Sequence, residues 1–411
     1  MSFSKHKTIE VSLSDIQKAR EDLNPYVKPT PLLYNKWLSE AFQCDLYLKL
    51  ESMQSIGSFK IRGATRKILK LTESERKRGV IAASAGNHAQ GVAWASRHLG
   101  VRATIVMPAD AALVKVHNTQ ALGAEVILHG ANYDEAYSRA LELAEENQSV
   151  FVSAYQDPDV IAGQGTVGLE ILDHLNDIDV LVSSVGGGGL MTGLGTVFQA
   201  LSPRTRLIAC QASGAAAMCR SVQAQKCIEI DHVHTFADGI AIKRASDVMR
   251  KLLTPLVHDW VAVDDDAIAA AVFTLMEKAK VIAEGSAAIT LAALESFRDQ
   301  VRGKRVVLVI SGGNIDVNLL SRIIDIGMIK SGRRVRVNVV ISDKPGSLAR
   351  LTALIAQQGA NVLQAIHDRN EPSTRIDETE VALTLETKGI DHSQVLMDEL
   401  GKHVIRLELT H

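Results

Sequence analysis

The sequence predicts an α/β region of parallel sheets, followed by a small α+β domain. From about residue 44 to residue 313, short β-branched apolar runs alternate with segments of helical periodicity. Strands that are apolar along their whole length are typical of parallel sheets covered by helices on both faces, with ligands at the carboxyl ends of the strands. Near residue 333 the order of the patterns changes. A chain of 411 residues is long enough for two or three compact units.

The elements of the first region follow one another regularly. The strand patterns are CDLYLKL (44–50), GVIAAS (79–84), RATIVMP (102–108), AEVILHG (124–130), VFVSAY (150–155), DVLVSSV (179–185), RLIACQA (206–212) and KRVVLVIS (304–311). Helical patterns lie at 57–71, 87–100, 113–123 and 133–146. Glycines cluster where the strands end, so we expect a ligand site at that edge.

The second region begins after the polar segment SGRR. Its patterns are a strand (RVRVNVVI), a helix (SLARLTALIAQQG), two strands (ANVLQAIHDR and ETEVALTLET), a helix (SQVLMDELGKH) and a last strand (VIRLEL). This order is the βαββαβ arrangement of ferredoxin-like domains. We therefore expect residues 333–411 to form a separate small domain.

Charge and hydropathy exclude several classes of partner. Lys and Arg number 45 against 47 Asp and Glu, so the excess of positive charge that nucleic acid requires is absent. The N-terminal segment MSFSKHKTIEVSLSDIQKAR lacks the apolar stretch of a secretory signal, and no later apolar run approaches the roughly 18 residues of a membrane span. We expect a cytoplasmic protein with neither a nucleic-acid nor a membrane partner.

Cysteine usage gives no sign of a disulfide framework or a metal site. No CxxC pair occurs among the four cysteines, which are Cys44, Cys210, Cys219 and Cys227. His232 and His234 lie near Cys227, but their spacing matches no zinc-ligand pattern. No metal site is predicted.

Lys60 lies in GSFKIRGA, just inside the predicted start of a helix. A free lysine, with a pKa of about 10.4, is a poor nucleophile at neutral pH, but a helix N-terminus and partial burial both disfavour its charged form. A lysine in such a place is suited to Schiff-base chemistry. Position alone also fits a solvated surface lysine.

A run of four glycines, Gly186, Gly187, Gly188 and Gly189, lies between the strand pattern DVLVSS and a helical pattern that begins at Leu190. Backbone N–H groups of such a loop close around a phosphate, and the following helix adds its positive end. A lone glycine run is often only a turn. Its place between strand and helix favours phosphate without saying which phosphate.

Five segments together resemble the fold type II (tryptophan synthase beta-like) pyridoxal-phosphate enzymes, and within them the threonine and serine dehydratases. They are GSFKIRGA around Lys60, SAGNHAQG at 84–91, GGGGL at 186–190, ADGIA at 237–241 and SGGN at 311–314. The resemblance covers residues of about 15 to 325. It implies pyridoxal 5′-phosphate as cofactor and a catalytic region over 1–328, with a small subdomain at roughly 72–158 inserted in a larger one.

The resemblance also implies which residues hold the cofactor. Lys60 would bind it covalently and act as the catalytic base, and the phosphate would lie on Gly186 to Leu190. Asn87 would donate a hydrogen bond to the phenolic oxygen, and Ser311 would face the pyridine nitrogen. Phe59 and Gly239 complete the expected cofactor site. A neutral hydroxyl at Ser311 makes the cofactor a weaker electron sink, which suits elimination of a β-hydroxyl better than transamination.

The substrate is expected at the start of the helix that follows GVIAA. The backbone N–H groups of five residues would receive its carboxylate: Ser84, Ala85, Gly86, Asn87 and His88. Related racemases have serine where this chain has Ala85, so racemisation is disfavoured. Gln211 stands where metal-binding relatives have an acidic ligand, which disfavours a divalent cation.

Two further departures from the family pattern lie near the expected site. Ile56 replaces the usual threonine before GSFK, and EGSAA at 284–288 replaces EGAGA or EPAGA. Glu284 is either a contact of the cofactor pocket or a charge on a helix surface.

The C-terminal region resembles an ACT domain, with DKPGSL at 343–348 before its first helix and GANVLQAIHDR at 359–369 after it. Such domains pair side by side and bind an amino acid at the strand–helix junction. The resemblance implies an effector, isoleucine or valine, with Gly346 and Asn361 as candidate contacts, and a homodimer or homotetramer. A domain that only drives oligomerisation is the alternative.

The expected activity is the deamination of L-threonine to 2-oxobutanoate and ammonia, and of L-serine to pyruvate. Losing one methyl group changes binding in a pocket by only about 1 to 3 kcal/mol, so we expect both substrates to react. One rival is a 3-hydroxyaspartate ammonia-lyase, and a rival of another class is a non-catalytic amino-acid sensor. Because 2-oxobutanoate leads toward isoleucine, isoleucine biosynthesis is a natural context, but the residues fit a catabolic role equally well.

Overall fold

The computed structural model describes residues 9–369 and 374–409. By their internal contacts, residues 1–315 and 316–411 form two compact units. Residues 1–8, which open the segment used to predict that no secretory signal is present, lie outside the described part, as do residues 410 and 411 at the end of the predicted second domain. No helix in the described part is long and apolar enough to span a membrane.

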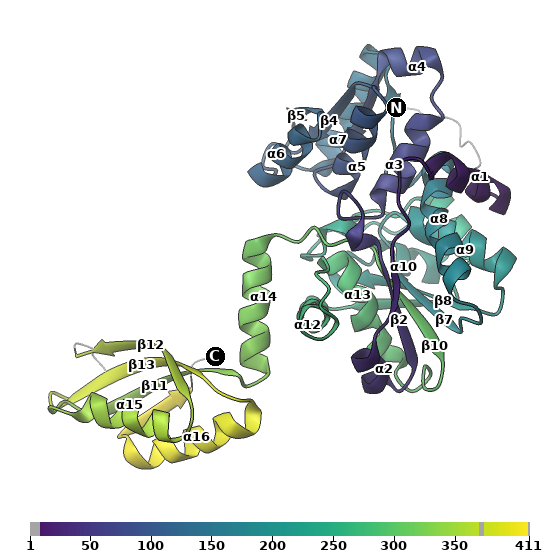
Figure 1. The fold of residues 1–411 in the computed structure, drawn as a ribbon. Helices are drawn as coiled ribbons and strands as arrows, with labels where there is room; N and C mark the ends of the chain where they lie inside the picture. The colour runs from purple at the N-terminus through teal and green to yellow at the C-terminus, as the bar shows by residue number, and fades with distance from the viewer. Residues whose placement is uncertain (1–8, 370–373, 410–411) are drawn as a thin grey trace. The chain divides into compact units, whose positions relative to one another are not determined.

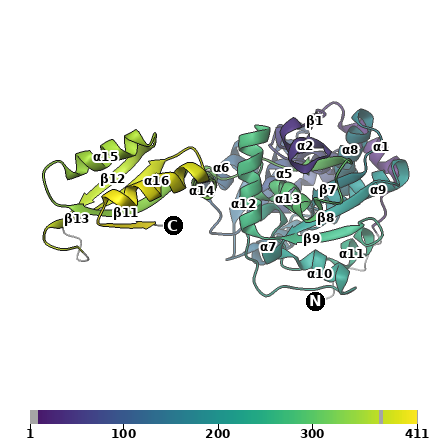
Figure 2. The ribbon, with the colours of Figure 1, turned by 90° about the horizontal axis from the view of Figure 1, so that it is seen from below.

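The larger sheet of the first unit has six strands. Their order is β1 (Leu32–Tyr34), β2 (Asp45–Leu50), β10 (Arg305–Ile310), β7 (Val180–Ser184), β8 (Arg206–Ala212) and β9 (Asp259–Val263). All neighbours are parallel except β1 and β2. Helices α8 (Pro158–His174) and α9 (Gly189–Leu201) share an apolar cluster with one face, and α13 (Gly285–Leu294) packs on the opposite face (Figures 1 and 2).

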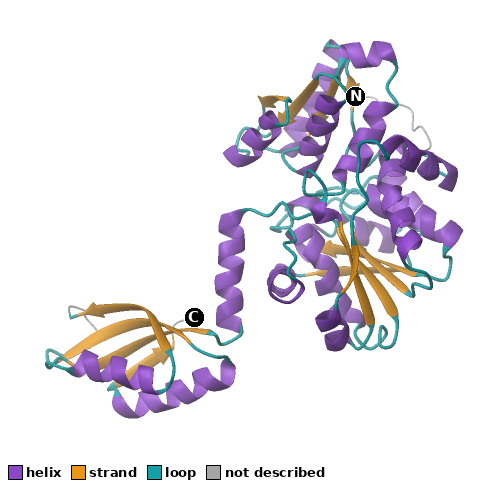
Figure 3. Ribbon diagram, viewed as in Figure 1, coloured by secondary structure: helices purple, strands orange, loops and turns teal. Residues whose placement is uncertain are grey.

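The smaller sheet of this unit is entirely parallel. Its order is β5 (Glu125–Leu128), β4 (Ala103–Met107), β3 (Val80–Ala83) and β6 (Val150–Phe151). Helix α7 (Tyr133–Glu146) covers one face, and α3 (Lys60–Leu69) and α5 (Asn87–His98) share an apolar cluster with the other. The prediction of parallel sheets covered on both faces is therefore confirmed (Figure 3).

The remaining elements of the first unit connect and cover these sheets. They are α1 (Leu13–Leu23), α2 (Lys36–Phe42), α4 (Glu73–Arg78), α6 (Leu113–Ala121), α10 (Ala217–Gln223), α11 (Asp247–Leu253), α12 (Asp265–Thr274), the 3₁₀ turns η1 (Glu51–Met53), η2 (Ser213–Ala215), η3 (Asp238–Ile240) and η5 (Glu295–Phe297), and the π-helical turn η4 (Leu275–Ala279).

The second unit has the predicted order of strands and helices. After α14 (Val317–Lys330) come β11 (Arg334–Ser342), α15 (Ser347–Gln357), β12 (Asn361–Asp368), β13 (Glu378–Glu386), α16 (Ile390–His403) and β14 (Arg406–Leu409). The sheet is antiparallel in the order β12-β13-β11-β14. Alternate residues of β11 and β13 are buried in one apolar cluster with α15 and α16, so both helices pack on one face (Figure 1).

Helix α14 belongs to the second unit, although the sequence analysis placed residues up to 328 in the catalytic region. The helix contacts β11, and Asp325 forms an ion pair with Arg334. The glycine at position 332 has φ +66° and makes the turn between helix and strand. The polar segment SGRR, from which the sequence predicts a boundary between domains, contains this turn.

Candidate active site

Lys60 is the first residue of α3, as the sequence predicts. Its Nζ donates a hydrogen bond to the carbonyl oxygen of Ala154 at 3.1 Å and lies 5.1 Å from the ring centre of Phe59. Burial lowers the pKa of Lys60 to about 8, although the nearby charge of Glu284 acts in the opposite direction. A large fraction of this lysine is therefore a neutral amine near pH 8, which is the form that attacks an aldehyde.

The backbone at Lys60 is held by neighbouring helices at very short range. A Cβ placed on Gly91 of α5 would lie 3.0 Å from the carbonyl oxygen of Lys60, and one on Gly163 of α8 would lie 2.7 Å from that of Arg62. Only glycine lets three helices approach this closely. The lysine therefore starts from a fixed backbone position.

A buried network of charges lies two residues beyond the lysine. Arg62 donates to Glu51 at 2.7 Å and to Glu170 at 2.6 and 2.8 Å. Lys49 donates to the same Glu170 at 2.6 Å. Two positive and two negative side chains, each less than a tenth exposed, thus join β2, η1, α3 and α8.

Asn87 is the first residue of α5, and its side chain meets Glu284. Its Nδ2 lies 2.9 and 3.0 Å from the two carboxylate oxygens of Glu284, which also accept a hydrogen bond from Ser286 at 2.6 Å. Burial raises the pKa of Glu284, and the hydrogen bonds from Ser286 and Asn87 oppose that rise. Glu284 thus lies against Asn87, one of the predicted cofactor residues.

The predicted substrate segment forms the entry into α5. The helix begins at Asn87 after the non-helical Gly86, and Ser84 Oγ accepts a hydrogen bond from the N–H of Gly86 at 3.1 Å. The ring of His88 is 3% exposed and lies 2.8 Å from the carbonyl oxygen of Val152. Burial and the charge of Lys60 lower its pKa to about 3, so the ring stays neutral. The side chain of His88 therefore has a structural role.

The glycine loop lies between β7 and α9, as predicted. A Cβ on Gly186 would lie 3.1 Å from the carbonyl oxygen of Gly239, and one on Gly187 would enter the ring of Tyr155. Gly188 has φ +99°, and Leu190 is buried under the sheet. A loop that tolerates no side chain and opens onto a 13-residue helix fits a phosphate group. Tyr155 was not among the predicted site residues; its only signal in the sequence is its place at the end of the strand pattern VFVSAY.

Ser311 directly follows β10, which ends at Ile310, and is 2% exposed. Its carbonyl oxygen accepts a hydrogen bond from the N–H of Phe59 at 3.0 Å, and Gly313 donates to the carbonyl oxygen of Gly57 at 2.9 Å. The backbone N–H of Glu284 donates a hydrogen bond to the carbonyl oxygen of Gly312 at 3.1 Å. The SGGN segment is thus joined to the loop that carries Lys60 and to Glu284. The groups present are of the kinds that pyridoxal phosphate requires: the amine of Lys60, the amide of Asn87, the hydroxyl of Ser311 and the backbone N–H groups of the glycine loop.

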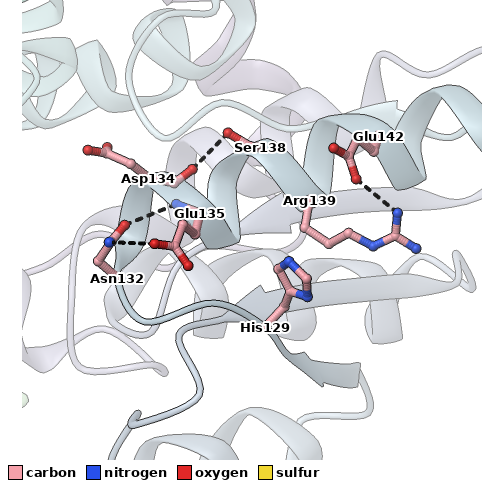
Figure 4. A pocket seen from close by; sticks show the side chains of 7 residues that line it. All are labelled: His129, Asn132, Asp134, Glu135, Ser138, Arg139 and Glu142. Atoms are coloured by element: carbon pink, nitrogen blue, oxygen red, sulfur yellow. Dashed lines mark hydrogen bonds and ion pairs between the residues drawn. The ribbon is translucent and has the colours of Figure 1, made fainter.

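Other predicted positions have structural surroundings. Gln211 accepts a hydrogen bond from the N–H of Cys219 at 2.7 Å, and Ile56 belongs to an apolar cluster with Leu23, Val27 and Ile61. Within residues 9–369 and 374–409, no three His, Cys, Asp or Glu side chains are grouped as a metal site would require. The polar hollow beside α7 in Figure 4 is lined by none of the predicted site residues.

The two candidate effector contacts lie in the second unit. Gly346 precedes α15 with φ +85°, a conformation that favours glycine. Asn361 begins β12, and its Nδ2 lies 3.5 Å from Glu386 on β13.

Known proteins resemble this chain over most of its length. Residues 23–312 match the sequence model of the family described as pyridoxal-phosphate dependent enzyme. L-threonine ammonia-lyase of Thermotoga maritima is 46% identical over 93% of this chain and 95% of that protein. L-threonine ammonia-lyase of Geobacter sulfurreducens is 40% identical over 94% and 96%. The processed form of threonine deaminase isoform 2 from Solanum lycopersicum is 33% identical with a TM-score of 0.73, over 80% of this chain and 92% of that one. The chain therefore belongs to the pyridoxal-phosphate-dependent enzymes and, within them, to the threonine ammonia-lyases.

Proposed function

We propose that the chain deaminates L-threonine to 2-oxobutanoate and ammonia, and L-serine to pyruvate, with pyridoxal phosphate bound at Lys60. The observation that carries the proposal is the amine of Lys60, which has a pKa of about 8 and lies among the cofactor-binding motifs. The relatives named as L-threonine ammonia-lyases support the choice of substrate.

Bound pyridoxal phosphate supplies an electron sink for negative charge at the substrate's α-carbon. Asn87 would donate to its phenolic oxygen, Gly186 to Leu190 would hold its phosphate, and Phe59 would lie beside its ring. Ser311 would offer the pyridine nitrogen a neutral hydroxyl, which holds a proton there less well than a carboxylate does. The sink is correspondingly modest, which favours rapid loss of a β-hydroxyl.

Lys60 is the proposed general base for the α-proton. Its lowered pKa of about 8 makes a neutral amine, able to take a proton at Nζ, far more abundant near pH 8 than for an ordinary lysine. The substrate carboxylate is held by N–H groups at the start of α5, where the positive end of a 12-residue helix adds to the attraction.

The rival activities fit the site less well. Ala85 has no hydroxyl to act as a second acid or base, which disfavours racemisation. A second substrate carboxylate, as in 3-hydroxyaspartate, needs a nearby cation. Lys115 of α6 lies beside the ADGIA loop, but its amine is paired with Asp238 at 2.7 Å. The presence of Lys60, Asn87 and Ser311 disfavours a non-catalytic sensor.

The test is 2-oxo acid release from L-threonine, L-serine and 3-hydroxyaspartate by the wild type and by Lys60→Ala. We expect threonine and serine to react and the variant to lose at least about a thousandfold in kcat, since both the base and the cofactor anchor are removed. Lys280→Ala, on an exposed turn after η4, is a matched control. No turnover of threonine by a wild type that holds the cofactor would refute the proposal.

We further propose that residues 333–411 act as an ACT domain that binds isoleucine or valine near Gly346 and Asn361 and pairs with a second copy. The antiparallel βαββαβ sheet and the positive φ of Gly346 support this assignment. We expect isoleucine to lower threonine turnover and Asn361→Ala to weaken that response. An enzyme that neither binds nor responds to either amino acid would leave the domain with oligomerisation alone.

A further inference from the structure

We infer that Asn314, with Glu284, fixes the orientation of the Asn87 side-chain amide in the cofactor site. The inference rests on the proposed function, because it concerns how Asn87 meets the cofactor. Asn314 is the last residue of the SGGN segment, and in this proposal it is a positioning residue that acts through Asn87.

The amide of Asn314 connects two parts of the site. Its Nδ2 donates to the carbonyl oxygen of Ile56 at 2.8 Å and to Oδ1 of Asn87 at 2.8 Å. An amide nitrogen has two hydrogens, so these bonds use both. The side chain thus bridges the loop before Lys60 and the start of α5.

Space for this bridge is provided by a glycine. Gly57 has φ +72°, and a Cβ at this position would lie 2.3 Å from Oδ1 of Asn314. The backbone bond from Gly313 to Gly57, at 2.9 Å, holds the two segments together at the same point. The contact between Asn314 and the loop is therefore set by the backbone of both segments.

Glu284 binds the other end of the Asn87 amide. Its carboxylate only accepts hydrogen bonds while ionised, and it lies 2.9 and 3.0 Å from Nδ2 of Asn87. A Cβ on Gly312 would lie 2.6 Å from Oε1 of Glu284, so that glycine makes room for the carboxylate.

These two neighbours leave Asn87 one stable orientation. An amide has nearly the same shape when turned over, and its hydrogen-bond partners decide between the two states. Here a donor, Asn314, meets Oδ1, and an acceptor, Glu284, meets Nδ2. The turned amide would place oxygen against the carboxylate. The two oxygens of Glu284 belong to one carboxylate and can share one hydrogen of Nδ2. The native orientation then leaves the second hydrogen of Nδ2 for an anionic phenolic oxygen.

Asn314→Asp tests the inference in the holoenzyme, because it replaces the donor by an acceptor of the same shape. With an acceptor on each side, neither orientation of the Asn87 amide is satisfied. We therefore expect the amide to lose its fixed orientation, the cofactor dissociation constant to rise about tenfold, and the pH midpoint of the cofactor's visible absorption band to shift toward that of Asn87→Ala. Asn318→Asp, the same change on exposed helix α14, is the matched control and should shift neither quantity.

A double-mutant cycle separates positioning from a general structural effect. If Asn314 acts through Asn87, introducing Asn314→Ala into the Asn87→Ala variant should raise the cofactor dissociation constant by less than about twofold. The inference would be overturned if the two alanine substitutions lowered cofactor affinity by independent, additive amounts. It would also be overturned if the Asn314→Asp protein kept the wild-type absorption band and cofactor affinity. If Asn87→Ala itself changed neither band nor affinity, the proposed cofactor role of Asn87 would fail instead. Asn314→Ala also serves in the cycle if the aspartate variant folds poorly.

Discussion

Two partly buried ionisable side chains, Lys60 and Glu284, shift each other's proton affinity within one site. Burial takes the pKa of Lys60 from an ordinary 10.5 to about 8, and the charge of Glu284 limits that fall. Above about pH 8 the folded protein holds a neutral amine, whereas an unfolded chain keeps its proton up to about 10.5. The unfolded state binds more protons in this window, so the contribution of Lys60 to stability rises with pH from about 8 to 10.5.

The same pKa predicts how the apoprotein captures its cofactor. We expect the rate at which the visible band forms after mixing with pyridoxal phosphate to rise with pH, with a midpoint of about 8. Glu284→Gln should move that midpoint lower, since it removes the charge that favours protonated Lys60. Glu277→Gln, a change of the same kind on η4, is the comparison. A midpoint near 10, or an upward shift in Glu284→Gln, would contradict the assignment.

At this scale, motifs predicted most of what the structure brings together. Lys60, Asn87 and Ser311 lie in segments whose spacing resembles a known family, and the glycine loop has the expected place between strand and helix. Tyr155 and the carbonyl oxygen of Ala154 were not predicted, because their roles arise where a loop of the smaller sheet meets residues distant in the chain. Such contacts leave no local pattern in sequence.

Among the elements, helix α3 depends most on close approach to its neighbours. A Cβ on Gly163 of α8 would lie 2.7 Å from both the carbonyl oxygen of Arg62 and Cα of Gly63. Both contacts are with backbone, so the helices themselves must separate. We expect Gly163→Ala to lower the free energy of unfolding by about 2 kcal/mol, measured by urea denaturation, and to weaken cofactor binding.

Gly401→Ala gives the matched control for this change. Gly401 also lies inside a helix, α16, but a Cβ there would meet nothing within 4 Å. Alanine should stabilise this position by about 0.5 to 1 kcal/mol, because it restricts the unfolded chain. Equal effects of the two substitutions would show that helix propensity, and not packing, controls α3.

The buried charge network makes a second prediction for the elements that it joins. Arg62→Met would leave Glu51 and Glu170 buried without their main partner, and breaking a buried pair in this way costs about 3 to 5 kcal/mol. The free energy of unfolding from urea titrations should fall by that amount. Arg20→Met, which removes the exposed pair with Asp173, should change it by less than about 1 kcal/mol. If Arg62→Met also lowered the free energy of unfolding by less than about 1 kcal/mol, the buried network would contribute little to stability.

Most strands could be predicted because continuous apolar runs are long and distinct in this sequence. Two strands of the larger sheet were missed for identifiable reasons. β1 has only three residues after Pro31, and β9 is partly exposed at the sheet edge, with Asp259 at its start. The compact second unit begins at Asp316, before α14, whereas the sequence predicts a catalytic region up to residue 328. An amphipathic pattern does not say which apolar surface its helix will cover.

For the whole molecule, the division into two compact units predicts two separable unfolding transitions. Calorimetry of the holoenzyme at fixed protein concentration should resolve one transition for each unit. A ligand at about a hundred times its dissociation constant stabilises the unit that binds it by about 2.7 kcal/mol. Pyridoxal phosphate should therefore raise the midpoint temperature of the transition of residues 1–315. Isoleucine or valine should raise the midpoint temperature of the transition of residues 316–411. In Lys60→Ala the first shift should shrink while the second persists. A single transition whose midpoint temperature rises with either ligand would contradict this prediction. It would show that the two units unfold cooperatively, so that binding to one unit also stabilises the other.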